Sequence, residues 1–148
     1  MVRFLTGVDR SKFVTAPHCS RVEKPWGYEI IWTPPGLPYV GKRLHVRGGN
    51  KISFQFHDEK IETQYLLDGE VVLLLENSQE IIESIIMQRG VGYTNIPGQR
   101  HRLIAVTDAN ILEVSTPETG DTYRLEDDYS RPTETEELRN TPNRGWSV

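Results

Sequence analysis

Residues 49–69 read GNKISFQFHDEKIETQYLLDG, and this stretch predicts two β-strands with a polar site between them. Residues 51–57 alternate between apolar side chains at even positions and polar side chains at odd positions. Successive side chains of a strand point to opposite faces, so one face is apolar and the other carries Ser53, Gln55 and His57. Residues 58–60 are expected to form a turn, and Asp68-Gly69 favours a tight hairpin. Glu62 opens the expected partner strand.

The rest of the chain continues this β pattern. Short apolar or β-branched runs recur between turn signals, at a spacing typical of sandwiches and barrels. They lie at residues 28–32, 42–47, 51–57, 63–67, 70–76, 81–87, 92–96, 101–106 and 110–115. Run 81–87 also has apolar pairs three or four residues apart, as in a helical turn, but its flanking strands and β-branched residues favour a strand. The pattern predicts an all-β protein, either a sandwich or a barrel.

The chain of 148 residues is long enough for one domain with its own core. Residues 1–21 are polar and mixed and are expected to form an irregular arm with at most one short strand. Residues 22–131 are the expected domain. Residues 132–148 are polar and proline-marked, which predicts a mobile C-terminal tail in which residues 134–139 could form a short helix.

Composition excludes several classes of function. The formal net charge is −4 and no basic run occurs, so binding to nucleic acid or to an anionic membrane is not expected. Cys19 is the only cysteine, which excludes an intramolecular disulfide framework and a multi-cysteine zinc site. The sequence also lacks the apolar stretches typical of a signal peptide or a membrane span. We therefore expect a cytoplasmic protein.

A set of metal ligands is the strongest functional signal. A hairpin formed by residues 51–67 would bring Gln55, His57 and Glu62 within reach of one another. Amide, imidazole and carboxylate groups suit Zn²⁺, Fe²⁺, Mn²⁺ or Ni²⁺. His101, which follows the turn at residues 97–100, is the expected fourth ligand. Glu59 is expected to be a solvated turn residue, with a role as replacement ligand as the alternative.

These motifs resemble those of a known family. The spacing G-x5-Q-x-H-x4-E-x6-G over residues 49–69 resembles the first cupin motif, and PG-x-x-H at residues 97–101 resembles the second. KPWGYE (24–29), QFHDEK (55–60), IPGQRHRL (96–103) and LEVSTPETGDTYRLEDDYSR (112–131) look like the cupin domain of type II mannose-6-phosphate isomerases. That domain often follows a mannose-1-phosphate guanylyltransferase, whose Gly-rich nucleotide-binding loop has no counterpart here. The resemblance covers about residues 22–131.

The chain departs from the family pattern at four places. Gln55 stands where many cupins have a histidine, and Glu59 stands where the isomerases usually have another. The turn before His101 is one residue shorter. Residues 33–38, TPPGLP, insert a loop near the expected barrel mouth.

The resemblance implies a double-stranded β-helix, or cupin jelly roll, with one divalent metal ion inside the barrel. Zn²⁺ is the first expectation, with Fe²⁺, Mn²⁺ and Ni²⁺ as alternatives. It also implies a sugar or sugar phosphate as ligand and aldose–ketose isomerisation of the mannose-6-phosphate isomerase type. The charged residues of RLEDDYSR (124–131) could either shape the substrate mouth or form a charged surface strand.

Isomerisation moves a proton between adjacent carbons, and a metal ion stabilises the charge that develops on their oxygens. A separate base must take the carbon-bound proton. Glu113 is a candidate if its strand turns it inward, and Lys51 and Lys42 are alternatives. The expected contacts to phosphate or hydroxyl oxygens are Arg43, Arg102 and Tyr123.

Other functions stay open on the same fold. The chain could bind a sugar without turning it over, in a polysaccharide or nucleotide-sugar pathway. It could be a sugar epimerase, which would be active without metal, or a metal-dependent dioxygenase, which would bind Fe²⁺ and consume oxygen. Because small jelly rolls often pair their edge strands, we also expect a homodimer.

Overall fold

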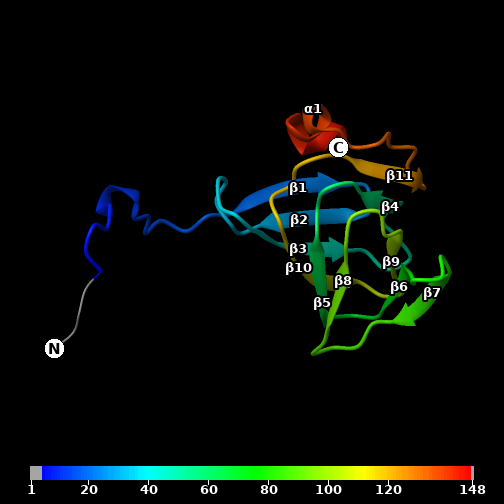
Figure 1. The fold of residues 1–148 in the computed structure, drawn as a ribbon. Coiled ribbons are helices and arrows are strands. Elements are labelled where there is room, and N and C mark those ends of the chain that lie inside the picture. The colour runs from blue at the N-terminus through cyan, green and yellow to red at the C-terminus, as the bar shows by residue number, and fades with distance from the viewer. Residues whose placement is uncertain (1–4, 148) are drawn as a thin grey trace.

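The computed structural model describes residues 5–147, which form a mostly β structure with short helical turns near the two ends (Figure 1). The strands, in chain order, are β1 (Ser20–Lys24), β2 (Gly27–Ile31), β3 (Val40–Val46), β4 (Phe54–His57), β5 (Glu62–Asp68), β6 (Val71–Glu76), β7 (Ile82–Ile86), β8 (Gly92–Asn95), β9 (His101–Ala105), β10 (Ala109–Ser115) and β11 (Thr122–Glu126). The all-β prediction is confirmed, and residues 82–86 form a strand rather than a helical turn. None of the described helices is long and apolar enough to cross a membrane.

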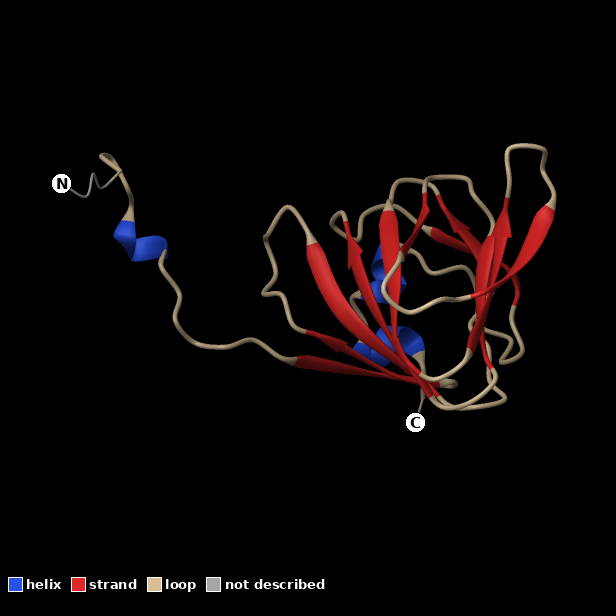
Figure 2. Cartoon of the chain, turned by 90° about the horizontal axis from the view of Figure 1, so that it is seen from below, coloured by secondary structure: helices blue, strands red, loops and turns tan. Residues whose placement is uncertain are grey.

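The strands form two antiparallel sheets, which Figure 2 shows as facing layers. One sheet has the order β1-β2-β3-β10-β5-β8 and the other has the order β11-β4-β9-β6-β7. From β3 onward the chain changes sheet at almost every connection, as in a jelly roll. The double-stranded β-helix predicted for this chain is therefore the observed architecture.

The predicted pairing around residues 49–69 is wrong. Strands β4 and β5 lie in opposite sheets, so His57 and Glu62 meet across the barrel and not along a hairpin. β5 and β6 are also not paired with each other, because the chain changes sheet at Gly69, whose φ is +87°. A Cβ at Gly69 would lie 2.4 Å from the carbonyl oxygen of Asp108, so this turn requires glycine.

The inward-facing positions divide the barrel interior into an apolar end and a polar end. The apolar end holds the hydrophobic core, which includes Val46, Leu66, Leu103 and Ile111, all of them buried. Moving along the same faces, four strands change from apolar to polar residues: Leu44 to Lys42 on β3, Leu66 to Gln64 on β5, Leu103 to His101 on β9, and Ile111 to Glu113 on β10. The change brings buried polar side chains from both sheets into one chamber.

The ends of the chain differ from each other. Residues 5–19 extend away from the barrel as an arm with one turn of 3₁₀ helix, η1 (Arg10–Lys12) (Figure 1). The C-terminal segment instead packs on the barrel through α1 (Glu136–Arg139) and η2 (Pro142–Gly145). Glu134 pairs with Thr122 through two 2.9 Å backbone hydrogen bonds, and the side-chain Oδ1 of Asn143 accepts a hydrogen bond from the Glu23 backbone N–H at 3.0 Å. The segment contains the short helix that the sequence suggested, but it is not a free tail.

Candidate metal centre

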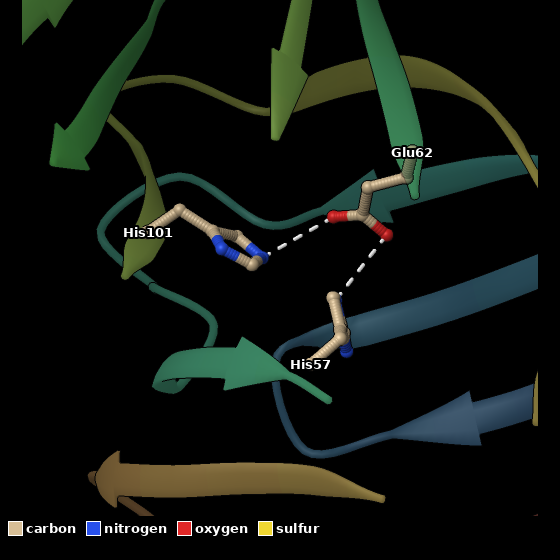
Figure 3. A group of neighbouring side chains, drawn as sticks. All are labelled: His57, Glu62 and His101. Carbon is tan, nitrogen blue, oxygen red and sulfur yellow. Dashed lines mark ion pairs between the residues drawn. The ribbon is translucent and has the colours of Figure 1, made fainter. Parts of the chain in front are cut away.

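His57, Glu62 and His101 meet inside the polar chamber (Figure 3). They come from the end of β4, the start of β5 and the start of β9, and each residue is at most 3% exposed. His101 Nε2 lies 3.2 Å from Glu62 Oε1, and His57 Nε2 lies 3.5 Å from Glu62 Oε2. One ligand atom from each residue lies within 4.8 Å of the others. The structure therefore brings together three of the four predicted metal ligands.

Both imidazole rings are oriented by their other nitrogen. His101 Nδ1 lies 2.9 Å from the carbonyl oxygen of Gln99, which can only accept, so this nitrogen carries the proton. His57 Nδ1 lies 3.0 Å from Thr122 Oγ1. His57 Nε2 and His101 Nε2 are buried and have no hydrogen-bond partner. Buried polar atoms without partners are uncommon, and here both face the carboxylate of Glu62.

This arrangement fits a first-row divalent metal ion. Ligand atoms about 2.1 Å from a tetrahedral ion lie about 3.4 Å apart, close to the two nitrogen–oxygen distances given above. The second ring nitrogen of a metal-bound histidine generally donates its N–H to an oxygen, as Nδ1 of His101 does. Two imidazoles and one carboxylate suit Zn²⁺, Fe²⁺, Mn²⁺ and Ni²⁺ alike, so the donor set does not select among them.

Gln55 lies next to this cluster. It is the register partner of His101 across the β4–β9 pair, and its side chain lines the same cavity. Its Oε1 accepts a hydrogen bond from Ser53 Oγ at 2.5 Å. Its role as a fourth ligand stays a prediction. Glu59 is exposed in the turn before β5, which agrees with the favoured reading of this residue.

Lys60 is a member of the site that the sequence did not reveal. It is buried, and its Nζ lies 2.7 Å from Glu62 Oε2, 3.3 Å from Glu113 Oε2 and 3.7 Å from Glu118 Oε1. Residues 58–60 were expected to form a solvated turn, but Lys60 points inward from the end of that turn. Its place two residues before Glu62, on the same face of an extended chain, is the signal that could have found it.

Two amides complete the surroundings of the Glu62 carboxylate. Gln64 Nε2 donates to Glu62 Oε1 at 3.3 Å and to Glu113 Oε1 at 3.2 Å. Asn95 Nδ2 donates to Glu62 Oε1 at 3.1 Å. Both amides are buried, and Gln64 links Glu62 to Glu113, so the two carboxylates are held at fixed positions relative to each other.

The electrostatics favour the metal-binding protonation states of Glu62 and His57. Burial alone would raise the pKa of Glu62, but Lys60 and the two histidines outweigh it and hold that pKa well below its usual range. Burial lowers the pKa of His57, which favours the neutral imidazole. Burial also opposes the charge of Lys60, yet Glu113, Glu62 and Glu118 raise its pKa well above the ordinary value. The site thus combines a carboxylate, a neutral imidazole and an ammonium.

The chamber encloses a cavity of about 60 Å³. Seven basic and five acidic side chains line it, so its wall carries a small excess of positive charge. Arg124 on β11 and Arg144 on η2 are among the basic ones, and both form 3.2 Å ion pairs with Glu134. Arg124 Nε is buried and has no hydrogen-bond partner. Arg144 comes from the segment that was expected to be mobile.

Glu113 faces the chamber, as a base acting at this site would have to. It is 4% exposed on the inward face of β10, 3.5 Å from the ammonium of Lys42 and 3.3 Å from that of Lys60. Of the two alternative bases, Lys42 lines the cavity and Lys51 lies outside it. Lys51 Nζ pairs with Asp128 at 3.4 Å near the surface, so the geometry does not support Lys51 as a base.

The three predicted substrate contacts also lie outside the cavity. Arg43 faces the outer side of β3, where Nη2 lies 3.5 Å from the Tyr28 hydroxyl. Arg102 is buried, but its Nε donates to the carbonyl of Ile52 at 2.8 Å. Tyr123 stacks on Phe56 at 4.9 Å between ring centroids, on the face of β11 opposite Thr122. Strand alternation explains all three, because each residue is a direct neighbour of an inward-facing one.

Comparison with known proteins gives the fold and no more. No family model and no curated protein matches the chain. Among solved structures, the chain is similar to oxalate decarboxylase from Bacillus subtilis, with a TM-score of 0.63 and 18% identity over 84% of this chain and 32% of that chain. It is also similar to KdgF from Halomonas sp., with a TM-score of 0.56 and 16% identity over 68% of this chain and 86% of that chain. The chain thus spans about a third of the length of oxalate decarboxylase. With two facing antiparallel sheets and these structural neighbours, the chain has the cupin jelly-roll fold, with a His–Glu–His cluster inside the barrel.

Proposed function

We propose that this protein is a metal-dependent enzyme that isomerises a sugar phosphate between its aldose and ketose forms. One observation carries the proposal. The unpartnered Nε2 atoms of His57 and His101 face the carboxylate of Glu62, and Glu113, a carboxylate outside that cluster, shares their chamber. The sequence resemblance to type II mannose-6-phosphate isomerases supports this choice among the reactions known on the fold.

His57, Glu62 and His101, with Gln55 as fourth ligand, would hold the metal ion. A bound ion with these ligands keeps a positive charge, and it would act as a Lewis acid that polarises the substrate carbonyl. Glu113 would take the proton from the carbon next to that carbonyl and deliver it to the former carbonyl carbon, while the hydroxyl proton moves from one oxygen of the enediol to the other. Gln64 and Lys60 each contact one oxygen of Glu113 and so orient it.

Arg124 replaces the predicted Arg43 and Arg102 as the proposed phosphate contact. It lines the cavity, and its Nε has no hydrogen-bond partner, so it can donate to an anion without first breaking a bond at that atom. The basic excess of the cavity wall favours a negatively charged substrate.

The test has two steps. Elemental analysis of the purified chain should find about one divalent ion per chain. The metal-loaded protein should then be incubated in D₂O with a panel of aldose and ketose phosphates, and NMR should show interconversion with deuterium entering at the carbon next to the carbonyl. Oxygen consumption with bound Fe²⁺ would instead support a dioxygenase. Saturable binding at full metal occupancy, with no new isomer and no exchange, would support a non-catalytic sugar-binding cupin.

A further inference from the structure

Lys60 occupies the carboxylate side of the candidate metal centre. Its Nζ lies 2.7 Å from Glu62 Oε2, the same oxygen that lies 3.5 Å from His57 Nε2. The Lys60 side chain is only 10% exposed, and the Glu62 side chain 1%. The ammonium therefore approaches Glu62 from inside the chamber, where solvent does little to screen it.

A metal ion and this ammonium compete for the same oxygen. Both are cations, and both would lie within a few ångströms of each other if they held Glu62 together. In a buried site of low polarity such like charges repel strongly. A metal ion bound by His57, His101 and Glu62 is therefore favoured by movement of Lys60 away from Glu62.

Lys60 has other partners ready for that movement. Glu113 Oε2 and Glu118 Oε1 already lie 3.3 Å and 3.7 Å from its Nζ. A lysine stem is flexible, and its ammonium has three donors, so it can release one carboxylate and keep two. Lys42 contacts the same two carboxylates, at 3.5 Å from Glu113 and closer to Glu118, so this pair of carboxylates already holds a second ammonium.

We propose that Lys60 is an internal cation that competes with the metal ion for Glu62 and thereby sets the metal affinity of the site. Metal binding moves the ammonium from Glu62 towards Glu113 and Glu118, and loss of the metal lets it return. This inference rests on the proposed metal-dependent function. It adds that metal occupancy is controlled by a residue that is not itself a ligand.

The test measures metal binding directly, by calorimetric titration of the full chain, stripped with a chelator, with Zn²⁺ and separately with Mn²⁺. Lys60→Met removes the ammonium and keeps much of the side-chain volume, and it should bind metal about 10- to 100-fold more tightly than the unmodified chain. Lys60→Arg keeps the charge and should not bind more tightly. Lys24→Met is the matched control, because Lys24 is a buried lysine of the same cavity that pairs with Glu29 and Glu134 at 3.8 Å and 4.0 Å. It should leave the affinity nearly unchanged.

If the unmodified chain binds metal and Lys60→Met binds it equally or more weakly, the proposed competition is overturned and the metal site stands. If neither chain binds metal, both proposals fail. Tight binding by Lys60→Met alone would support the competition and show that the unmodified site is held closed. If Lys60→Met does not fold, Lys60→Gln takes its place. A crystal structure of the unmodified chain soaked with metal gives an independent answer, since Lys60 should then be beyond hydrogen-bond distance of Glu62.

Discussion

His101 Nδ1 lies 2.9 Å from the carbonyl oxygen of Gln99, and this bond decides what the ring can do. The carbonyl belongs to the turn that leads into β9, so the backbone itself fixes the tautomer. Nε2 faces Glu62 Oε1 at 3.2 Å and has no hydrogen-bond partner. A histidine that served only as a core residue would be expected to satisfy both nitrogens.

Replacement of His101 by alanine should therefore abolish metal binding without unfolding the barrel. We expect affinity to fall by more than about 100-fold, because changes to residues behind the ligands alone cost about 10- to 100-fold. Calorimetric titration with Zn²⁺ measures the change. His45→Ala is the matched control, since His45 stacks on Tyr28 on the outer face of its sheet. Unchanged metal content in His101→Ala would contradict the assignment of the site.

Gln55 provides a separate test of the fourth position. Gln55→Ala should weaken metal binding by about tenfold, and Gln55→His should strengthen it, because imidazole is the better ligand for zinc-like ions. The same titration applies. Ser53→Ala removes the hydrogen-bond donor to Gln55 but no ligand, so it should have a smaller effect. If Gln55→Ala binds metal as well as the unmodified chain, Gln55 is a neighbour of the site and not a ligand.

Glu113→Gln should separate metal binding from catalysis. The change keeps the shape of the side chain and removes its ability to accept a proton, so we expect turnover to fall by about 10²- to 10⁴-fold. At saturating metal the metal content should persist, because Glu113 is not among the clustered ligands. Deuterium incorporation from D₂O is the direct measurement. Full exchange activity in a metal-loaded Glu113→Gln protein would remove Glu113 as the base.

The sequence predicted the strands and the ligand cluster better than it predicted their arrangement. Period-two alternation identified a polar face on residues 53–57, and motif spacing linked it to Glu62 and His101. Alternation is local, however, and does not say which sheet a strand joins. The structure therefore overturned the expected hairpin, and His57 and Glu62 face each other from opposite sheets.

The charged interior was hidden for a related physical reason. Charged residues near turns usually lie in solvent, so the burial of Lys60 and Arg144 was not expected, and only the two-residue spacing from Glu62 pointed to Lys60. They are buried because carboxylates distant in sequence compensate them. Arg144 contacts Glu118 and Glu134, and Lys60 contacts Glu113, which lies 53 residues away. Such long-range ion pairs do not follow from hydrophobic periodicity. Hydrophobic periodicity also does not show that Arg124, and not Arg43 or Arg102, lines the cavity.

The C-terminal segment makes a further prediction, on acid stability. Burial would raise the pKa of Glu134, but Arg144, Lys24 and Arg124 outweigh it and lower this pKa from 4.5 to about 2. A carboxyl group whose pKa is lower in the folded state stabilises the fold above its unfolded pKa, and this contribution is lost as the pH falls from about 4.5 towards 2. A shift of this size corresponds to about 3 kcal/mol of unfolding free energy.

Glu134→Gln should therefore be less stable at pH 7, because it weakens the ion pairs of four largely buried cations, Lys24, Arg124, Arg139 and Arg144. It should also lose less stability than the unmodified chain when the pH is lowered from 4.5 to 3, although Glu118, whose pKa is also depressed, still contributes. Urea unfolding at pH 7, 4.5 and 3 measures both effects. Glu137→Gln, at an exposed position on α1, is the control and should follow the unmodified chain. If Glu134→Gln and the unmodified chain lose the same free energy over this range, Glu134 does not anchor the C-terminal segment electrostatically, and packing of α1 and η2 must hold it in place.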